Sequence, residues 1–125
     1  FYYPDDLAAL EAAGAELVPI DTLHDTRLPA IDGLFIGGGF PEACMAELEA
    51  NAALRGAIRA AIEGGLPTYA ECGGLMYLAR SITWQGRSAR MVGAIPATAA
   101  AMGMRMDSGK TGFTGRWRGY PLERR

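Results

Sequence analysis

Short apolar runs alternate with segments of helical periodicity along most of the chain. Six runs predict strands, at residues 1–3, 15–20, 34–36, 67–71, 82–85 and 90–95. The first looks like the end of a buried strand, and the last two flank Gly86. The run Leu34, Phe35, Ile36 is continuous and is closed by three glycines, which is typical of a central strand in a parallel sheet.

Apolar residues at helical spacing fill the segments between these strands. Helices are expected over residues 5–13, 43–49 and 52–63, and directly after Cys72. Asp5 or Asp6 would cap the first helix, and Gly14 would end it. The alternation of strand and helix predicts an α/β fold, with an open, mostly parallel sheet and helices on both of its faces.

Composition and charge describe a globular domain. The 125 residues are 50% hydrophobic and carry a net charge of -2, and no apolar window reaches the roughly 18 residues of a membrane-spanning helix. No secretory leader is recognised, and two cysteines make no disulfide framework, so we expect a cytoplasmic location. A single histidine, His24, limits acid–base chemistry, and no metal site is expected.

Two loops after predicted strands carry the candidate chemistry, because ligands collect at the carboxyl ends of strands in an open α/β sheet. In the first loop, Gly37, Gly38 and Gly39 let backbone N–H groups approach a ligand, as an oxyanion site requires. A tight strand-to-helix turn explains the same glycines equally well.

The second loop, Ala70-Glu71-Cys72-Gly73-Gly74, has the pattern of a nucleophile elbow. A sharp strand-turn-helix corner holds the central side chain above the sheet and needs small residues two positions to either side. Ala70 and Gly74 meet that requirement. A buried structural cysteine is the alternative for Cys72, just as Cys44 is expected on a helix facing the core.

These segments resemble a known family. PTYAECGGLMYLA at 67–79, GLFIGGGFPE at 33–42 and the opening FYYPDDLAALEAAGAEL resemble the glutamine amidotransferase domain of the cobyrinic acid a,c-diamide synthases, over about residues 1–96. The sister cobyric acid synthases usually have Tyr and Gln after the two glycines of the elbow. Glu71, Leu75 and Met76 favour the diamide synthases.

The resemblance implies a class I, cysteine-dependent glutaminase of flavodoxin-like fold, incomplete at both ends and fused behind an ATP-using synthetase domain. Cys72 would be the nucleophile, and the backbone of Gly37, Gly38, Gly39 and Gly73 would form the oxyanion hole and glutamine site. Ala70, Glu71 and Gly74 would support the elbow.

The resemblance also implies the larger reaction and its partners. Glutamine-derived ammonia would pass to the synthetase domain, where Mg-ATP activates the a and c carboxylates of cobyrinic or hydrogenobyrinic acid in cobalamin biosynthesis. The implied partners are glutamine and, through that domain, a corrinoid or related tetrapyrrole, with no nucleic acid and no membrane. A homodimer is left open, and no cofactor is expected in residues 1–125.

The sequence also departs from the family. The family's general base is a histidine downstream of the elbow, whereas no histidine follows Cys72 and His24 lies in an earlier connection. We therefore expect little glutaminase activity from this chain alone. Residues 1–100 would be a partial amidotransferase domain. Residues 101–125 are rich in Gly and Arg, which predicts a loop or an unstructured end. Within them, Gly109-Lys110-Thr111 lacks the glycine spacing of a P-loop. Residues 116–120 mix basic and aromatic side chains but lack a folded platform for binding nucleic acid.

Two other functions fit the same elbow. A DJ-1-like cysteine protein, acting as a redox sensor or small hydrolase, also places a reactive cysteine after a strand, but usually has another residue at the position of Gly73. A non-catalytic fragment that docks on a synthetase partner is the second alternative.

Overall fold

The computed structural model describes residues 1–100 and the backbone of residues 103–106. The Gly-Lys-Thr run and residues 116–120 lie outside the described residues. The described elements follow one another in this order: α1 (Pro4–Ala12), β1 (Leu34–Ile36), η1 (Pro41–Cys44), α2 (Met45–Ala50), α3 (Ala52–Glu63), β2 (Thr68–Ala70), α4 (Gly73–Leu78), β3 (Ala79–Trp84), β4 (Arg87–Arg90), β5 (Ile95–Ala100) and β6 (Gly103–Met106).

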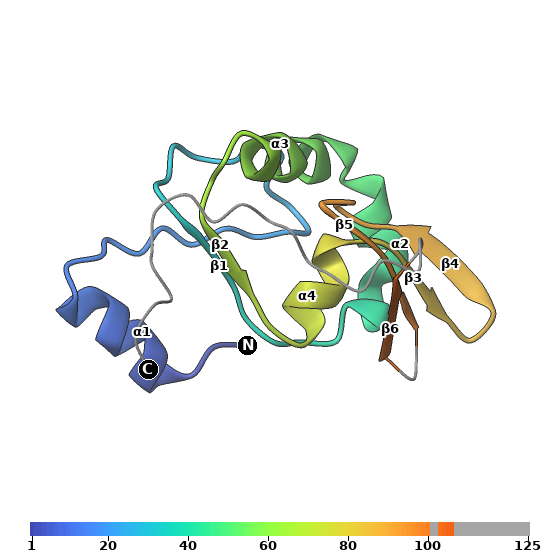
Figure 1. The fold of residues 1–125 in the computed structure, drawn as a ribbon, viewed down its shortest axis with the longest axis horizontal. Helices are drawn as coiled ribbons and strands as arrows, with labels where there is room; N and C mark the ends of the chain where they lie inside the picture. The colour runs from blue at the N-terminus through green and yellow to red at the C-terminus, as the bar shows by residue number, and fades with distance from the viewer. Residues whose placement is uncertain (101–102, 107–125) are drawn as a thin grey trace.

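The α/β class is confirmed, and the described strands divide between two sheets. Strands β1 and β2 form a parallel pair, with Leu34 opposite Thr68 and Ile36 opposite Ala70. The second sheet has the order β4-β3-β5-β6 and is mixed, because only β3 and β5 run parallel. Figure 1 shows α1 on one side of the β1–β2 pair and α4 with the mixed sheet on the other.

The core lies between α3, α4 and the mixed sheet. Leu54 and Ile58 of α3, at the predicted helical spacing, are buried, while Ile62 is half-buried. They pack in one cluster with side chains that include Leu78 of α4 and Ile82 of β3. Helix α1 buries no residue. None of the helices in the described part of the chain has the length and apolar character to span a membrane.

Two predicted strands are wrong. Residues 1–3 and 15–20 are irregular, and Phe1 is 63% exposed. Pro4 starts α1 at once after Tyr3, and Pro19 has no N–H to donate to a sheet ladder.

The predicted cap of α1 is wrong too. Tyr3 is the N-cap residue, Pro4 occupies the first turn, and Asp5 and Asp6 follow it there without a capping hydrogen bond. Gly14 does take the expected positive φ, 96°.

The strands around Gly86 lie earlier than predicted. Gln85 and Gly86 both have positive φ and form a two-residue turn, so Trp84 pairs with Arg87. The strand that pairs with β3 across this turn is therefore β4, and not the predicted strand at residues 90–95. Strand β5 was not predicted beyond Ile95, because its alanine-rich sequence has low strand propensity. Residues 103–106, expected as loop, pair with β5 as β6.

Candidate functional site

Cys72 stands on a strained corner between β2 and α4. Its backbone has φ 50° and ψ -119°, a region that is sparsely populated by residues with a side chain. The N–H of Gly74 donates to the carbonyl of Glu71 at 2.8 Å, and the N–H of Leu75 donates to the carbonyl of Cys72 at 3.1 Å. The Cys72 residue is exposed. The corner therefore has the geometry of a nucleophile elbow, with its thiol open to a ligand.

The glycine loop packs directly against this corner. A Cβ at Gly73 would lie 2.7 Å from the carbonyl carbon of Gly39 and closer still to its oxygen. A Cβ at Gly74 would lie 2.5 Å from the carbonyl oxygen of Ile36 and 2.6 Å from that of Gly37. Only glycine permits such an approach of two backbones.

The two predicted loops are thus brought together at the carboxyl ends of β1 and β2. The N–H of Glu71 donates to the carbonyl of Ile36 at 3.1 Å and continues the parallel pairing past the last strand residue. A Cβ on Gly38 would lie 3.7 Å from the Cβ of Cys72, so the loop passes close to the thiol-bearing residue. The backbone nitrogen of Phe1 donates to the carbonyl of Gly38.

The two residues before Cys72 have different surroundings. Ala70 ends β2 opposite Ile36 and is half-buried, as the small-residue requirement of the elbow demands. The carboxylate of Glu71 accepts a hydrogen bond from the hydroxyl of Tyr69 at 3.1 Å. This carboxylate raises the pKa of the Tyr69 hydroxyl.

An open cavity of about 460 Å³ lies beside the glycine loop. Its wall includes Gly37–Gly39, Gly73 and Gly74, the connection around Asp21–Leu23, Cys44 and Tyr77. Cys44 is half-buried and packs against the core as expected, and burial, with help from Glu47 and Glu42, raises the pKa of its thiol. A raised pKa leaves less of the Cys44 thiol in the nucleophilic thiolate form.

Sequence reasoning missed Tyr77. Its side chain is 4% exposed, and no described residue hydrogen-bonds its hydroxyl. Burial raises the pKa of Tyr77 to about 12. Its place on the apolar side of α4 suggests only a core residue, so no sequence signal marks the hydroxyl.

His24 lies on the connection that forms one wall of this cavity, and its side chain is 78% exposed. Its Nδ1 lies 2.7 Å from a carboxylate oxygen of Asp21, which raises the pKa of His24. The amide of Asn51 holds the connection by donating to the carbonyls of Thr22 and Asp25, at 2.9 and 2.8 Å. The histidine is paired with Asp21 rather than with a cysteine.

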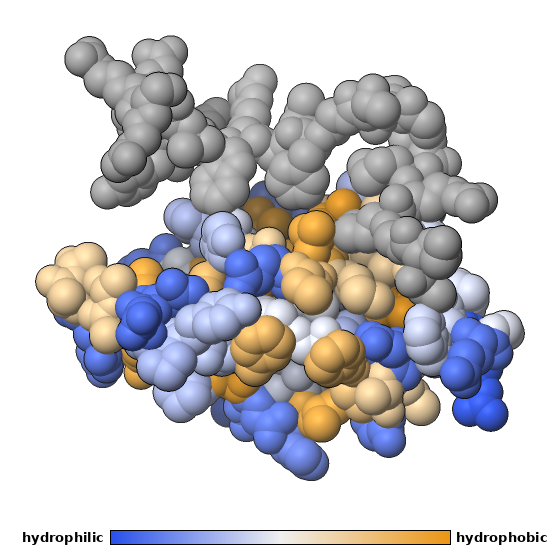
Figure 2. All heavy atoms as spheres, turned by 90° about the horizontal axis from the view of Figure 1, so that it is seen from below, coloured by the Kyte–Doolittle hydropathy of each residue, from blue (hydrophilic) through white to orange (hydrophobic). Residues whose placement is uncertain are grey.

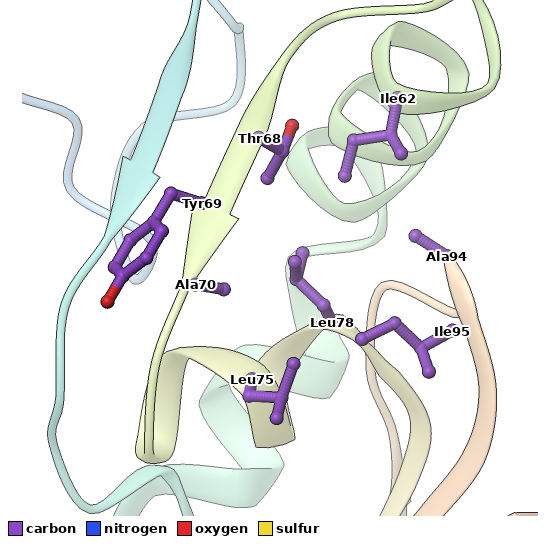
Figure 3. Close-up of a pocket in the computed structure, with 8 residues that line it drawn as sticks. All are labelled: Ile62, Thr68, Tyr69, Ala70, Leu75, Leu78, Ala94 and Ile95. Carbon is purple, nitrogen blue, oxygen red and sulfur yellow. The ribbon is translucent and has the colours of Figure 1, made fainter. Parts of the chain in front are cut away.

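A second, apolar groove of about 340 Å³ follows β2. Figure 3 shows Ile62, Leu75, Leu78 and Ile95 converging on it, while Tyr69 points away on the other side of the strand. Among the described residues, neither cysteine lines this groove, and Tyr69 is the one titratable side chain that borders it. The described lining therefore offers little for the chemistry of a reaction.

A metal-binding cluster could also lie on the surface of residues 1–100. Figure 2 shows the molecule from below, with apolar residues standing between hydrophilic ones over the middle of that face. Within the described ranges, no group of three or more His, Cys, Asp or Glu side chains is placed to hold a metal ion.

Comparisons with known proteins show which family the chain resembles. Residues 1–120 match the profile of the CobB/CobQ-like glutamine amidotransferase domain. The match extends beyond residue 96, where the resemblance seen in the sequence ended. The chain is 51% identical over 96 residues to a cobyrinate a,c-diamide synthase of Magnetococcus marinus, a match that covers 77% of this chain and 21% of the relative. It is 48% identical over 111 residues to the enzyme of that name from Synechocystis, covering 87% of this chain and 23% of the relative.

A third relative, a cobyrinate a,c-diamide synthase of Methanosarcina acetivorans, is 54% identical over 83 residues, which cover 66% of this chain and 17% of the relative. The chain thus spans about a fifth of the curated relatives it matches. No solved structure matches it.

Proposed function

Because the chain belongs to the CobB/CobQ-like glutamine amidotransferase family, we propose that it forms the glutamine-hydrolysing portion of a cobyrinate a,c-diamide synthase. In this proposal the ammonia that it releases amidates the a and c carboxylates of cobyrinic or hydrogenobyrinic acid during cobalamin biosynthesis. The observation that carries the proposal is the positive φ of Cys72 on a corner packed against three consecutive glycines.

Cys72 is the proposed nucleophile. Its thiolate attacks the side-chain carbonyl carbon of glutamine, and the carbonyl oxygen becomes an oxyanion. Backbone N–H groups of Gly37, Gly38, Gly39 and Gly73 are the proposed donors to that oxyanion and to the glutamine. When the tetrahedral intermediate collapses, the carbon–nitrogen bond breaks and protonated nitrogen leaves as ammonia. Water then hydrolyses the glutamyl thioester, so that glutamine and water give glutamate and ammonia.

The elbow geometry supports this role in two ways. A positive φ lifts the side chain of Cys72 out of the sheet, which accounts for its exposure. The close packing of Gly73 on Gly39 keeps both proposed groups of N–H donors beside one thiol. Each preorganised donor of this kind stabilises the transition state of acyl transfer by about 3–4 kcal/mol.

We place Mg-ATP and the corrinoid in the synthetase part of the longer relatives and assign no step of the glutaminase reaction to them. The described residues hold no cluster suited to a metal ion, and the Gly-Lys-Thr run lies outside them. Glutamine is the one small-molecule substrate that we assign to this chain.

The proposed reaction lacks a histidine base after Cys72 in this chain. The His24 side chain is paired with Asp21 and exposed to solvent. We therefore expect glutamine hydrolysis by the chain alone to be close to background. Glutamate release by the isolated chain, abolished by Cys72→Ala, would contradict this expectation.

A direct test is to treat the chain with a diazoketone analogue of glutamine while added imidazole supplies the missing base. We expect mass spectrometry to find Cys72 modified in preference to Cys44, with protection by glutamine but not by glutamate. Equal modification of the two cysteines would argue against the function. Peroxide oxidation of Cys72 with no response to glutamine would favour a DJ-1-like role, which the family match does not support.

A further inference from the structure

The outer edge of β2 has no partner among the described strands. The N–H of Glu71 donates to the carbonyl of Ile36 at 3.1 Å, so every second residue from Glu71 backwards faces β1. The backbone N–H and C=O groups of Thr68 and Ala70 therefore point away from β1. The described backbone offers these groups no partner, although both residues are half-buried. Unpaired groups at such an edge are a template for another strand.

The apolar groove of about 340 Å³ runs along this free edge. All three residues of β2 line it, and its far wall comes from α3, α4 and the start of β5. Figure 3 shows the side chains of Thr68 and Ala70 on the groove side of β2, whereas Tyr69 points to the opposite face. A strand added at this edge would place every second side chain in the groove and the others beside Tyr69.

The face that carries Tyr69 is aromatic and acidic. The ring of Phe35 stacks on that of Tyr69 with centroids 5.2 Å apart, and Tyr69 is still 53% exposed. The carboxylate of Glu71 accepts a hydrogen bond from the Tyr69 hydroxyl, and the charge of Asp6 lies near enough to help raise the pKa of that hydroxyl. Neither carboxylate forms an ion pair with a described residue. An arginine fits this face, because a guanidinium both pairs with carboxylates and stacks on aromatic rings.

One segment outside the described residues has the sequence pattern that the two faces require. Residues 113–119 read Phe-Thr-Gly-Arg-Trp-Arg-Gly. In an extended chain Phe113 and Trp117 fall on one face, and Arg116 and Arg118 fall on the other. The aromatic face matches the apolar groove, and the basic face matches the side of β2 that carries Tyr69 and the two carboxylates.

The chain leaves β6 close to this groove. Met106 pairs with Ala97, which is two residues after the groove residue Ile95. Paired strands lie about 5 Å apart and two strand residues span about 7 Å, so Met106 is near the groove wall. Residues 107–112 can span about 20 Å when extended, which lets the next residues reach the edge of β2.

We propose that residues 113–119 add to the outer edge of β2 as a strand. Phe113 and Trp117 fill the groove, while Arg116 and Arg118 lie on the face of Tyr69 and Glu71. This interaction does not depend on the proposed glutaminase function, so it can be tested whether or not the chain hydrolyses glutamine.

Trp117 reports on this interaction. In a Trp84→Phe chain it is the only tryptophan, since the sequence has two. We expect acrylamide to quench its fluorescence several-fold less than in a free peptide of residues 113–119. Leu75→Asp, which puts a charge in the groove, should restore the quenching of the free peptide. Leu17→Asp is the matched control, because both leucines are 37% exposed but Leu17 lies outside the groove wall.

A charge reversal tests the opposite face and keeps the test decisive if Leu75→Asp lowers the melting temperature. In the Trp84→Phe chain, Glu71→Lys should increase the quenching of Trp117. Adding Arg116→Glu and Arg118→Glu to that variant should lower the quenching again. Glu47→Lys, at an exposed position of α2, is the control and should leave the quenching unchanged.

Three results would each overturn the proposal. They are free-peptide quenching in the Trp84→Phe chain, equal quenching in Leu75→Asp and Leu17→Asp, and no recovery on charge reversal. Protection of Trp117 that persists on dilution supports a contact within one chain. Protection that is lost on dilution would assign the segment to the groove of a second copy, and would overturn the proposal as well.

Discussion

At the scale of single residues, the backbone of Cys72 is the most constrained feature of the site. A residue with a Cβ at φ 50° and ψ -119° pays a conformational cost of about 1–3 kcal/mol, which surrounding packing has to offset. The glycines of both loops do this by locking the corner against β1. Strain of this kind is typical of a residue held in place for chemistry.

We expect Cys72→Gly to be more stable than Cys72→Ala by about 1 kcal/mol, because glycine relieves the strain and alanine keeps it. Urea denaturation of both variants measures the difference. Cys44 is the matched control. Its φ is -137°, so Cys44→Gly should be less stable than Cys44→Ala. The same order of stability at both positions would show that Cys72 is not strained.

The pair formed by Asp21 and His24 makes a second residue-scale prediction. Hydrogen bonding to Asp21 raises the pKa of His24 from its ordinary value of 6.5, and hydrogen bonding to His24 lowers the pKa of Asp21 from 3.8. The histidine contribution to stability is therefore complete below pH 6.5 and is lost as pH rises through the raised value. The aspartate contribution is present above pH 3.8 and is lost as pH falls through the lowered value.

Asp21→Asn should lower the pKa of His24 back toward 6.5. NMR titration of the imidazole protons measures this without overlap, because His24 is the only histidine. Glu63→Gln, which alters an ion pair with Arg59, is the control and should leave the titration unchanged. An unaltered midpoint in Asp21→Asn would contradict the pairing.

At the scale of elements, the site depends on two loops meeting. Gly73→Ala would place a Cβ against the backbone of Gly39, which cannot move as a side chain does. We expect a loss of stability of about 1–3 kcal/mol or more, together with loss of analogue labelling at Cys72. Gly56→Ala in α3 is the control, since a Cβ there meets nothing within 4 Å and should stabilise the helix by about 1 kcal/mol. Full labelling in Gly73→Ala would disprove the contact.

The Asn51 side chain links the start of α3 to the irregular segment that carries His24. Its side-chain oxygen accepts from the N–H of Leu54 at 3.3 Å, while its amide donates to Thr22 and Asp25. Asn51→Ala removes both functions and should cost about 1–2 kcal/mol, whereas Asn51→Asp keeps the helix cap alone.

Hydrogen exchange separates these two functions. The amide of Asp25, which donates to the carbonyl of Asp21 at 2.9 Å, should exchange faster in both Asn51 variants. The amide of Leu54 should exchange faster only in Asn51→Ala. Unchanged exchange at Asp25 in either variant would show that Asn51 does not hold the connection.

At the scale of the whole molecule, α3 and the mixed sheet share one core. Leu54 is fully buried, so Leu54→Ala should lower the free energy of unfolding by about 2–5 kcal/mol. Leu17→Ala is the control and should change it little, because Leu17 is exposed on an irregular segment. Guanidinium denaturation compares the two, and similar losses would mean that α3 is not docked on this core.

Local signals predicted much of the fold and of the site. The spacing of Leu54 and Ile58 predicted α3, the run Leu34–Ile36 predicted β1, and small residues on either side of Cys72 predicted the elbow. In each case the information lies within one turn of helix or one strand, where periodicity and side-chain size act directly. The domain boundary at residue 100 and the roles of the site residues stay predictions.

Non-local contacts decided the rest. The amino-acid sequence alone determined which segments are apolar, where glycine allows a sharp corner, and that one histidine precedes the elbow. Tertiary structure decided that residues 15–20 pair with no strand, that the alanine-rich β5 joins β3, and that the hydroxyl of Tyr77 is buried without a described partner. Strand pairing and burial depend on residues far apart in the chain, and no local pattern records which of them will meet.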